Sequence, residues 1–238
     1  MKKIIKFTLF LLFFFNNYVF AENHNEKINS NNELFIGQIN ASVYSKGFKR
    51  FSNYNIDFYL GSEIQYEDES SYISYKLIIN FVFPDLPFDY SNRKLIIPFS
   101  EWTFEREIQS YEENQLGLNQ LKFIVNKYKE WYQVVIDNKI NDYLKLIGYE
   151  YYNNYPGSSI RLTSFYFSKQ PDFPSNLVLN LLTYPPNENY LYDEESWWAE
   201  YYLNFNQVKQ LENLLDKDFL LSKISELEKQ ENIDEMFN

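Results

Sequence analysis

The chain repeats itself at an offset of 87 residues, and no other feature constrains its fold as strongly. Pro84-Asp85-Leu86-Pro87 aligns with Pro171-Asp172-Phe173-Pro174. Asn119-Gln120-Leu121-Lys122 aligns in the same way with Asn206-Gln207-Val208-Lys209. Seventeen identities fall in the sixty-six columns that begin at Gly61, whereas chance pairing at this composition would give roughly five. A fixed period of this kind predicts two tandem copies of one structural unit.

Alternating apolar residues and turn signals predict several strands and one helix in each copy. In the first copy the expected strands are 34–44, 56–66, 72–83, 94–97 and 102–108, with a helix after Asn119. In the second copy the strands are 144–152, 160–168 and 176–184, followed by an aromatic and acidic segment at 190–202 and a helix after Asn206. Asn119 and Asn206 are the expected helix N-caps, and Leu118 is expected to reach Phe123 as a hydrophobic staple.

We therefore expect an α+β protein made of two tandem copies of an antiparallel multi-strand unit followed by an amphipathic helix. A pseudo-two-fold axis would relate the copies, which either share one continuous sheet or pack face to face. The predicted divisions are a signal peptide at 1–21, a flexible leader at 22–33, the first unit at 34–139, the second unit at 140–230 and a frayed tail at 231–238.

The first residues are typical of a secretory signal peptide. Lys2, Lys3 and Lys6 precede a nearly continuous apolar run over 4–15, and Val19-Phe20-Ala21 supplies a cleavage site. The alternative is an uncleaved anchor helix. Cleavage would place the mature chain outside the cytoplasm, in the periplasm or secreted, and no later apolar stretch approaches the roughly 20 residues of a membrane span.

The formal net charge is −11. This charge argues against nucleic acid and anionic membranes as partners, because both reward Lys and Arg. A basic protein partner would suit it, although the acidity also simply keeps a secreted protein in solution.

The residue inventory argues against several kinds of chemistry. The chain has no cysteine and one histidine, His24 in the polar leader. Catalysis by Ser-His-Asp or Cys-His, and zinc sites of His and Cys, are therefore not expected. The six glycines do not form a phosphate loop, so we expect no cofactor, and no acidic run has the spacing of a calcium loop.

Carboxylates remain as the possible catalytic groups, because glycoside hydrolysis uses two of them. The offset pairs five acids: Glu63/Glu150, Asp85/Asp172, Glu101/Glu188, Glu107/Glu194 and Glu113/Glu200. Solvated acids in charged stretches, and turn-forming Asp in the Pro-Asp-x-Pro segments, are the simpler interpretation. We therefore predict no catalytic residue.

Trp197-Trp198 aligns with Ser110-Tyr111, so the tryptophan pair belongs to one copy only. On a strand the two rings would point to opposite faces; on a helix both would belong to the core. The exposed ring, with Tyr201 and Tyr202 nearby and Glu200 at the rim, would form an aromatic patch of the kind that anchors a protein or stacks on a sugar. The candidate partner-binding residues are Tyr190, Tyr192, Glu194, Glu195, Trp197, Trp198 and Tyr201.

These observations predict a secreted or periplasmic binding protein without enzymatic activity. It would engage a protein partner, preferentially basic, through an acidic aromatic surface, as an inhibitor or immunity-like protein does. A carbohydrate-binding or carboxylate-based glycan-cleaving envelope protein is the alternative, and a structural envelope component is a third possibility.

Overall fold

The computed structural model describes residues 33–45, 49–67, 70–86, 91–99, 116–170, 174–183 and 197–237. The predicted signal peptide, the leader up to residue 32 and the strand expected at 102–108 lie outside these ranges.

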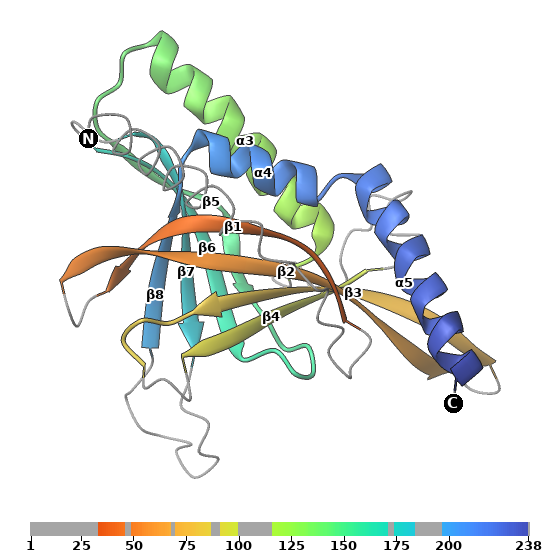
Figure 1. Ribbon diagram of the computed structural model, residues 1–238. Helices are drawn as coiled ribbons and strands as arrows, with labels where there is room; N and C mark the ends of the chain where they lie inside the picture. The colour runs from red at the N-terminus through yellow and green to blue at the C-terminus, as the bar shows by residue number, and fades with distance from the viewer. Residues whose placement is uncertain are drawn as a thin grey trace, which may run out of the picture.

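Eight strands form one antiparallel sheet (Figure 1). Their bounds are β1 (Glu33–Ser45), β2 (Arg50–Glu67), β3 (Ser70–Val82), β4 (Asn92–Phe99), β5 (Tyr143–Tyr152), β6 (Ile160–Lys169), β7 (Asn176–Thr183) and β8 (Trp197–Leu203). The spatial order is β4-β3-β2-β1-β8-β7-β6-β5. Two meanders, β1–β4 and β5–β8, therefore meet where β1 pairs with β8. The α+β class and the antiparallel strands are confirmed, and the two predicted units share one sheet.

The sheet curls until its two ends approach each other. The amide of Ser159 donates to the carbonyl of Lys94 on β4 at 2.8 Å, and the amide of Lys94 donates to Oγ of Ser159 at 2.7 Å. In Figure 1 the strands of the first meander run across those of the second. The strand β1 pairs with β2 along nearly its whole length, but it pairs with β8 only over Ser42–Tyr44, and β2 pairs with β3 only from Asp57 onward.

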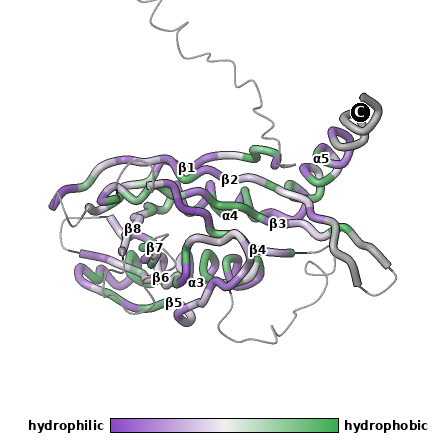
Figure 2. Tube along the Cα trace, turned by 90° about the horizontal axis from the view of Figure 1, so that it is seen from below, coloured by the Kyte–Doolittle hydropathy of each residue, from purple (hydrophilic) through white to green (hydrophobic). Residues whose placement is uncertain are grey.

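Three helices pack on one face of the sheet: α3 (Leu118–Asp137), α4 (Phe205–Leu214) and α5 (Lys217–Phe237). The helix α4 lies against β1, β7, β8 and α3, whereas α5 lies against β1 and β2. In Figure 2, α3 and α4 carry both hydrophobic and hydrophilic stretches, as helices with one apolar face do. The main core contains inward residues of all eight strands and of the three helices.

The β1–β2 ladder shows how strand residues divide between the two faces. Ile39, Ala41 and Val43 are buried against the core, and Gln38 and Asn40 lie on the opposite, exposed face. A bulge at Gly37 shifts the alternation by one residue. A Cβ there would lie 2.7 Å from a methyl group of Leu214, so glycine permits the close approach of α4.

Two details of the helix starts were predicted wrongly. The N-cap of α3 is Gly117, without a side-chain cap, and Leu118 is already helical while Phe123 is exposed, so the staple does not form. The N-cap of α4 is Asn204, two residues before the predicted Asn206. After α4 the helix α5 begins at Lys217 and continues through Phe237, into the segment at which a frayed tail was expected.

The offset of 87 residues matches the elements only in part. It places β2 on β5, β3 on β6, β4 on β7 and α3 on α4, but it places β1 on α3. The matched strands lie five places apart in the sheet and run in opposite directions, whereas the two four-strand meanders repeat at four places. The repeat in the sequence therefore pairs different strands from those that the two meanders would pair. The pseudo-two-fold relation stays a prediction.

None of the helices in the described ranges is both long enough and apolar enough to span a bilayer.

Candidate functional site

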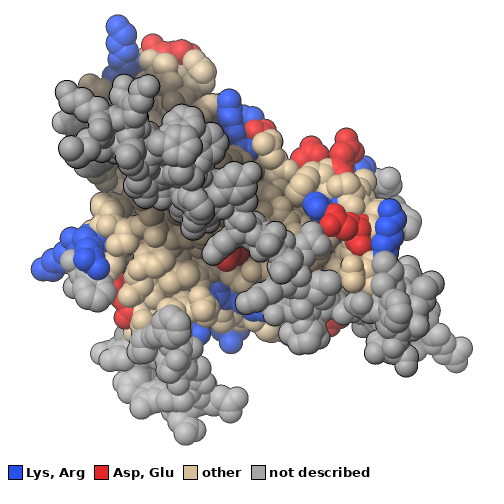
Figure 3. Space-filling view, viewed as in Figure 1, with Lys and Arg blue, Asp and Glu red and all other residues tan. Residues whose placement is uncertain are grey.

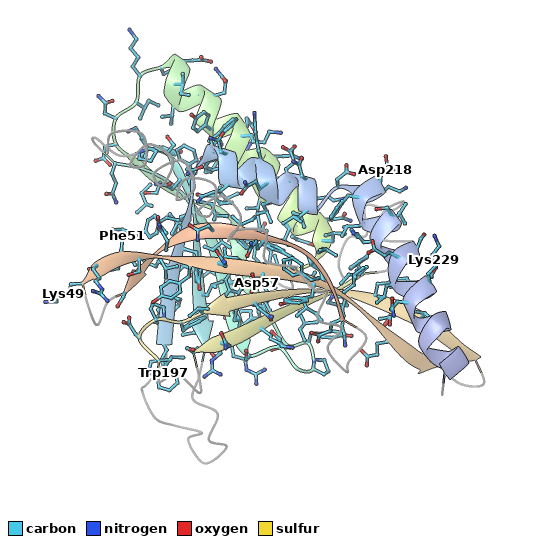
Figure 4. The ribbon with its side chains drawn as sticks, in the orientation of Figure 1. Lys49, Phe51, Asp57, Trp197, Asp218 and Lys229 are labelled. Atoms are coloured by element: carbon cyan, nitrogen blue, oxygen red, sulfur yellow. The ribbon has the colours of Figure 1, made fainter. Side chains whose placement is uncertain are left out.

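The predicted aromatic patch is only partly described. Tyr190, Tyr192, Glu194 and Glu195 lie outside the described residues. Trp197 and Trp198 are half-buried at the start of β8, and Figure 4 shows Trp197 at that end of the strand. Because the segment is a strand, the two rings divide between the faces as predicted: Trp197 packs against the main core, and Trp198 lies on the other face.

Tyr201 was assigned to the exposed patch wrongly, because its side chain has 0% exposure. Its hydroxyl donates to the carbonyl of Val82 at 2.5 Å and accepts from the amide of the same residue at 2.7 Å. Its ring meets Phe81 edge to face at 5.1 Å. Burial raises the pKa of Tyr201, so the hydroxyl stays protonated and joins β8 to the end of β3 across the core. The residues of β8 on the opposite face are Trp198, Glu200 and Tyr202, and all three are half-buried.

The paired acids do not form a described catalytic site. In four of the five pairs at least one member lies outside the described residues, and the exception is Glu63/Glu150. Glu63 and Glu150 are both exposed, and Glu63 accepts a hydrogen bond from Tyr155 and lies 3.7 Å from the ammonium of Lys76. Within the ranges described, no three acidic, histidine or cysteine residues gather as they would around a metal ion.

A pocket of about 370 Å³ lies where the two meanders meet, on the sheet face opposite the main core. It is lined by five strands and by the connections that follow β6 and β8; the strands are β1, β2, β6, β7 and β8. Its described lining residues are Ser42, Phe51, Ser168, Gln170, Pro174, Asn176, Tyr202, Asn204 and Gln207. They lie up to 165 positions apart in the chain, and the pairing of β1 with β8 brings them together.

Two aromatic rings form one side of the pocket. Phe51 is 56% exposed and meets the ring of Tyr202 at 5.2 Å and the ring of Tyr44 at 5.1 Å. The hydroxyl of Tyr202 donates to Oε2 of Glu200 at 2.8 Å. Burial and the neighbouring Glu200 carboxylate both raise the pKa of Tyr202, so this hydroxyl is protonated and the ring is held in place.

Amide side chains at the start of α4 form another side. The Asn204 side chain accepts hydrogen bonds from the amides of Asn206 and Gln207, and the Gln207 side chain accepts from the amide of Asn204 at 2.7 Å. This reciprocal capping box satisfies the first amides of the helix. The Gln207 side chain also donates to the carbonyl of Asn40 on β1, so the helix start is attached to the sheet beside the pocket.

The described lining residues carry no formal charge, although the whole chain has a net charge of −11. Asn and Gln each offer a carbonyl acceptor and an NH₂ donor, and Ser and Tyr hydroxyls do both. The arrangement therefore suits an uncharged ligand that has both donors and acceptors as well as an apolar surface. Among its described lining residues there is no pair of carboxylates of the kind that glycoside hydrolysis uses.

Comparisons of the chain with protein-family models, with curated proteins and with solved structures found no match to any of them.

The predicted patch and the pocket share β8, where Trp198 lies on the same face as the pocket residue Tyr202. Of the pocket residues, Tyr202 alone was considered as part of a site, as a neighbour of the predicted patch, whereas Pro174 and Gln207 were noted only as members of the repeat. The sequence held one further signal for this surface: Ser, Asn and Gln alternate with buried residues along 38–42 and 53–55. This alternation matches no functional motif, and its meaning depends on which strands neighbour β1 in the sheet.

Proposed function

We propose that this chain is an extracytoplasmic binding protein without enzymatic activity, and that its pocket takes an uncharged, hydroxyl-rich ligand, of which a sugar unit is the best-fitting class. The observation that carries the proposal is the neutral lining of the pocket, in which two aromatic rings face amide and hydroxyl groups.

The chemistry of a sugar matches both sides of this pocket. A sugar ring has apolar C–H surfaces that pack on aromatic faces, and hydroxyls that donate and accept hydrogen bonds. Preformed pockets of a few hundred Å³ with a small number of placed polar groups are typical of small-molecule sites. Two features support a pocket that is rigid before the ligand binds: the hydrogen bond from Tyr202 to Glu200 and the capping box at Asn204.

The extracytoplasmic location rests on the apolar run over 4–15 that follows Lys2 and Lys3. Glycans of the cell envelope would be the available ligands in that compartment. We also propose that the two meanders descend from one copied unit, and the shared order of β2–β4 and β5–β7 before a helix supports this origin.

A protein partner is the second candidate. Trp197 and Trp198 each keep part of their surface exposed at the start of β8, and partly exposed tryptophans are typical anchors of protein interfaces. In this version the partner is basic and binds at the start of β8, away from the neutral pocket. Alanine at Trp198 would then release the partner, and alanine at Tyr202 would not.

Isothermal titration with N-acetylglucosamine, chitobiose, glucose and cellobiose tests the sugar proposal. We expect binding of at least one of them to the intact chain and its loss in Tyr202→Ala. The matched control is Tyr152→Ala, since Tyr152 is 56% exposed on the distant edge strand β5. Absence of binding by all four sugars, or equal losses in both variants, would overturn the proposal.

A further inference from the structure

We propose that the pocket is one end of a longer binding strip along β1 and β2, and that this strip binds a linear, uncharged polysaccharide in an extended conformation. The proposal rests on the proposed function and names the ligand as a chain rather than a single sugar. The β1–β2 strip consists of Gln38, Asn40, Ser42, Asn53, Asn55 and Asp57.

The strip is a ladder of cross-strand polar pairs on the exposed face. Nδ2 of Asn40 donates to Oδ1 of Asn55 at 2.9 Å, and Nδ2 of Asn55 donates to Oε1 of Gln38 at 3.0 Å. Oγ of Ser42 donates to Oδ1 of Asn53 at 3.1 Å. These bonds orient the side chains and still leave each amide with hydrogen-bonding capacity for a ligand. The strip therefore presents ordered donors and acceptors at the strand repeat.

An aromatic pair closes the strip at each end. Tyr44 faces Phe51 across the ladder at the pocket end, and Phe35 faces Tyr59 at the other end with ring centroids 5.4 Å apart. The distance along β2 from Phe51 to Tyr59 is about 27 Å at the usual rise of a strand. Amides between two aromatic platforms over this length match several consecutive units of an extended chain, and a single sugar would leave most of the strip uncovered.

The strip and the pocket are continuous. Ser42 belongs to both, and Phe51 lines the pocket and also closes the ladder. Gln207 of the pocket donates to the carbonyl of Asn40 in the strip. A ligand unit held against the contacting rings of Phe51 and Tyr202 would therefore have its next unit over Ser42 and Asn53.

The charge of this surface matches an uncharged chain. Asp57 is the only residue of the strip with a formal charge, and Figure 4 shows it farther along β2 than Phe51. In Figure 3 the described surface over this part of the molecule is mostly uncharged, with basic side chains beyond its left end, where Figure 4 labels Lys49. An acidic polysaccharide would need basic residues along its path, and the strip has none.

Folding alone does not explain this composition. Asn is depleted in strands because it packs poorly on a pleated surface, yet Asn53 and Asn55 occupy successive outward positions of β2. The strand β1 pairs with β8 only over Ser42–Tyr44, and β2 pairs with β3 from Asp57 onward. On the outward face the available groups are side chains, which suits a ligand without a peptide backbone.

Titration with two oligomer series, N-acetylglucosamine and β-linked glucose from monomer to hexamer, tests the strip. We expect affinity in at least one series to rise with length and then level off, once the strip is covered. The double variant Asn53→Ala/Asn55→Ala is expected to bind the hexamer roughly tenfold more weakly, the effect of one or two lost hydrogen bonds, with unchanged monomer affinity. Asn154→Ala, an exposed asparagine beyond β5, is the matched control and is expected to change neither affinity.

The outcomes separate this inference from the proposed function. Equal affinity for monomer and hexamer, or a hexamer affinity that the double variant retains, would overturn the strip and leave the pocket. No binding in either series would overturn both. Sedimentation of the ligand-free chain completes the test: a dimer that the double variant abolishes would assign the strip to a second copy of the chain, and a monomer is expected.

Discussion

The two faces of β1 and β2 have opposite compositions on the same backbone. One face buries Ile39, Val43 and Phe58 completely or nearly so, and the other exposes Asn40 and Asn55 in a hydrogen-bonded ladder. The buried face follows from the physics of folding, since apolar area removed from water stabilises the chain. The exposed face is made of residues that strands ordinarily avoid. This difference indicates that the first face maintains the fold and that the second is available for binding.

The largest effect is expected from Phe58→Ala on the buried face. Removal of this ring leaves a cavity between β2 and the helices, and such changes cost about 3–5 kcal/mol. Urea unfolding followed by circular dichroism measures the loss. Asn55→Ala, three residues away on the exposed face, is expected to change stability by less than about 0.5 kcal/mol. Comparable losses in the two variants would show that the exposed face is also part of the fold.

Tyr201 and Tyr202 extend the comparison to β8, because consecutive residues face opposite sides. Tyr201→Phe leaves the amide and the carbonyl of Val82 without their buried partner, which costs about 1–3 kcal/mol. Tyr202→Phe loses only the bond to Glu200 at the half-exposed pocket and is expected to be close to neutral. Thermal unfolding of both variants measures the difference, and a less stable Tyr202→Phe would reverse the assignment of the faces.

Asn55→Thr tests whether the ladder is retained at a cost to stability. Threonine suits an exposed strand position better than asparagine, so we expect a gain of up to about 1 kcal/mol, together with weaker binding of the sugar hexamer. Chemical unfolding and titration of the same preparation give both quantities. A variant that is both less stable and fully active in binding would contradict the proposed division of roles.

The smallest effect is expected at Asp57, whose pKa is raised by burial. The folded state then binds this proton more tightly than the unfolded state does. The contribution of Asp57 to stability therefore falls as the pH rises from its ordinary pKa of about 4 through the raised value. Asp57→Asn is expected to remove this part of the pH dependence and to gain a few tenths of a kcal/mol at neutral pH. Stability curves between pH 3 and pH 7 test this, and parallel curves would contradict it.

The sequence was sufficient to predict local structure. Alternation indicated β1 to β4 and β5 to β7, and the apolar stripe from Leu121 to Val135 indicated α3, because strand and helix periods depend on neighbouring residues. The helix starts were less predictable: Asn204 and Asn206 are both good caps, and only the geometry of the turn after β8 selects Asn204.

The pocket was not predictable in the same way. Its residues come from distant parts of the chain, and the pairing of Ser42 with Tyr202 is a long-range contact that no local pattern encodes. The repeat directed attention to Trp197 and Trp198 as residues of one copy only. Neutral side chains such as Asn53 and Gln207 have no catalytic motif, so their role becomes visible only when the fold places them beside aromatic rings.

The most direct test of the account is a nuclear magnetic resonance titration of the isotope-labelled chain with the N-acetylglucosamine and glucose hexamers. The account predicts that at least one hexamer shifts the side-chain amide signals of Asn40, Asn53 and Asn55 together with the ring signals of Phe51 and Tyr202. It also predicts unchanged indole signals of Trp197 and Trp198. Shifts confined to the two indoles, or no shifts with either hexamer, would contradict the claim that the neutral face of β1 and β2 is the binding surface.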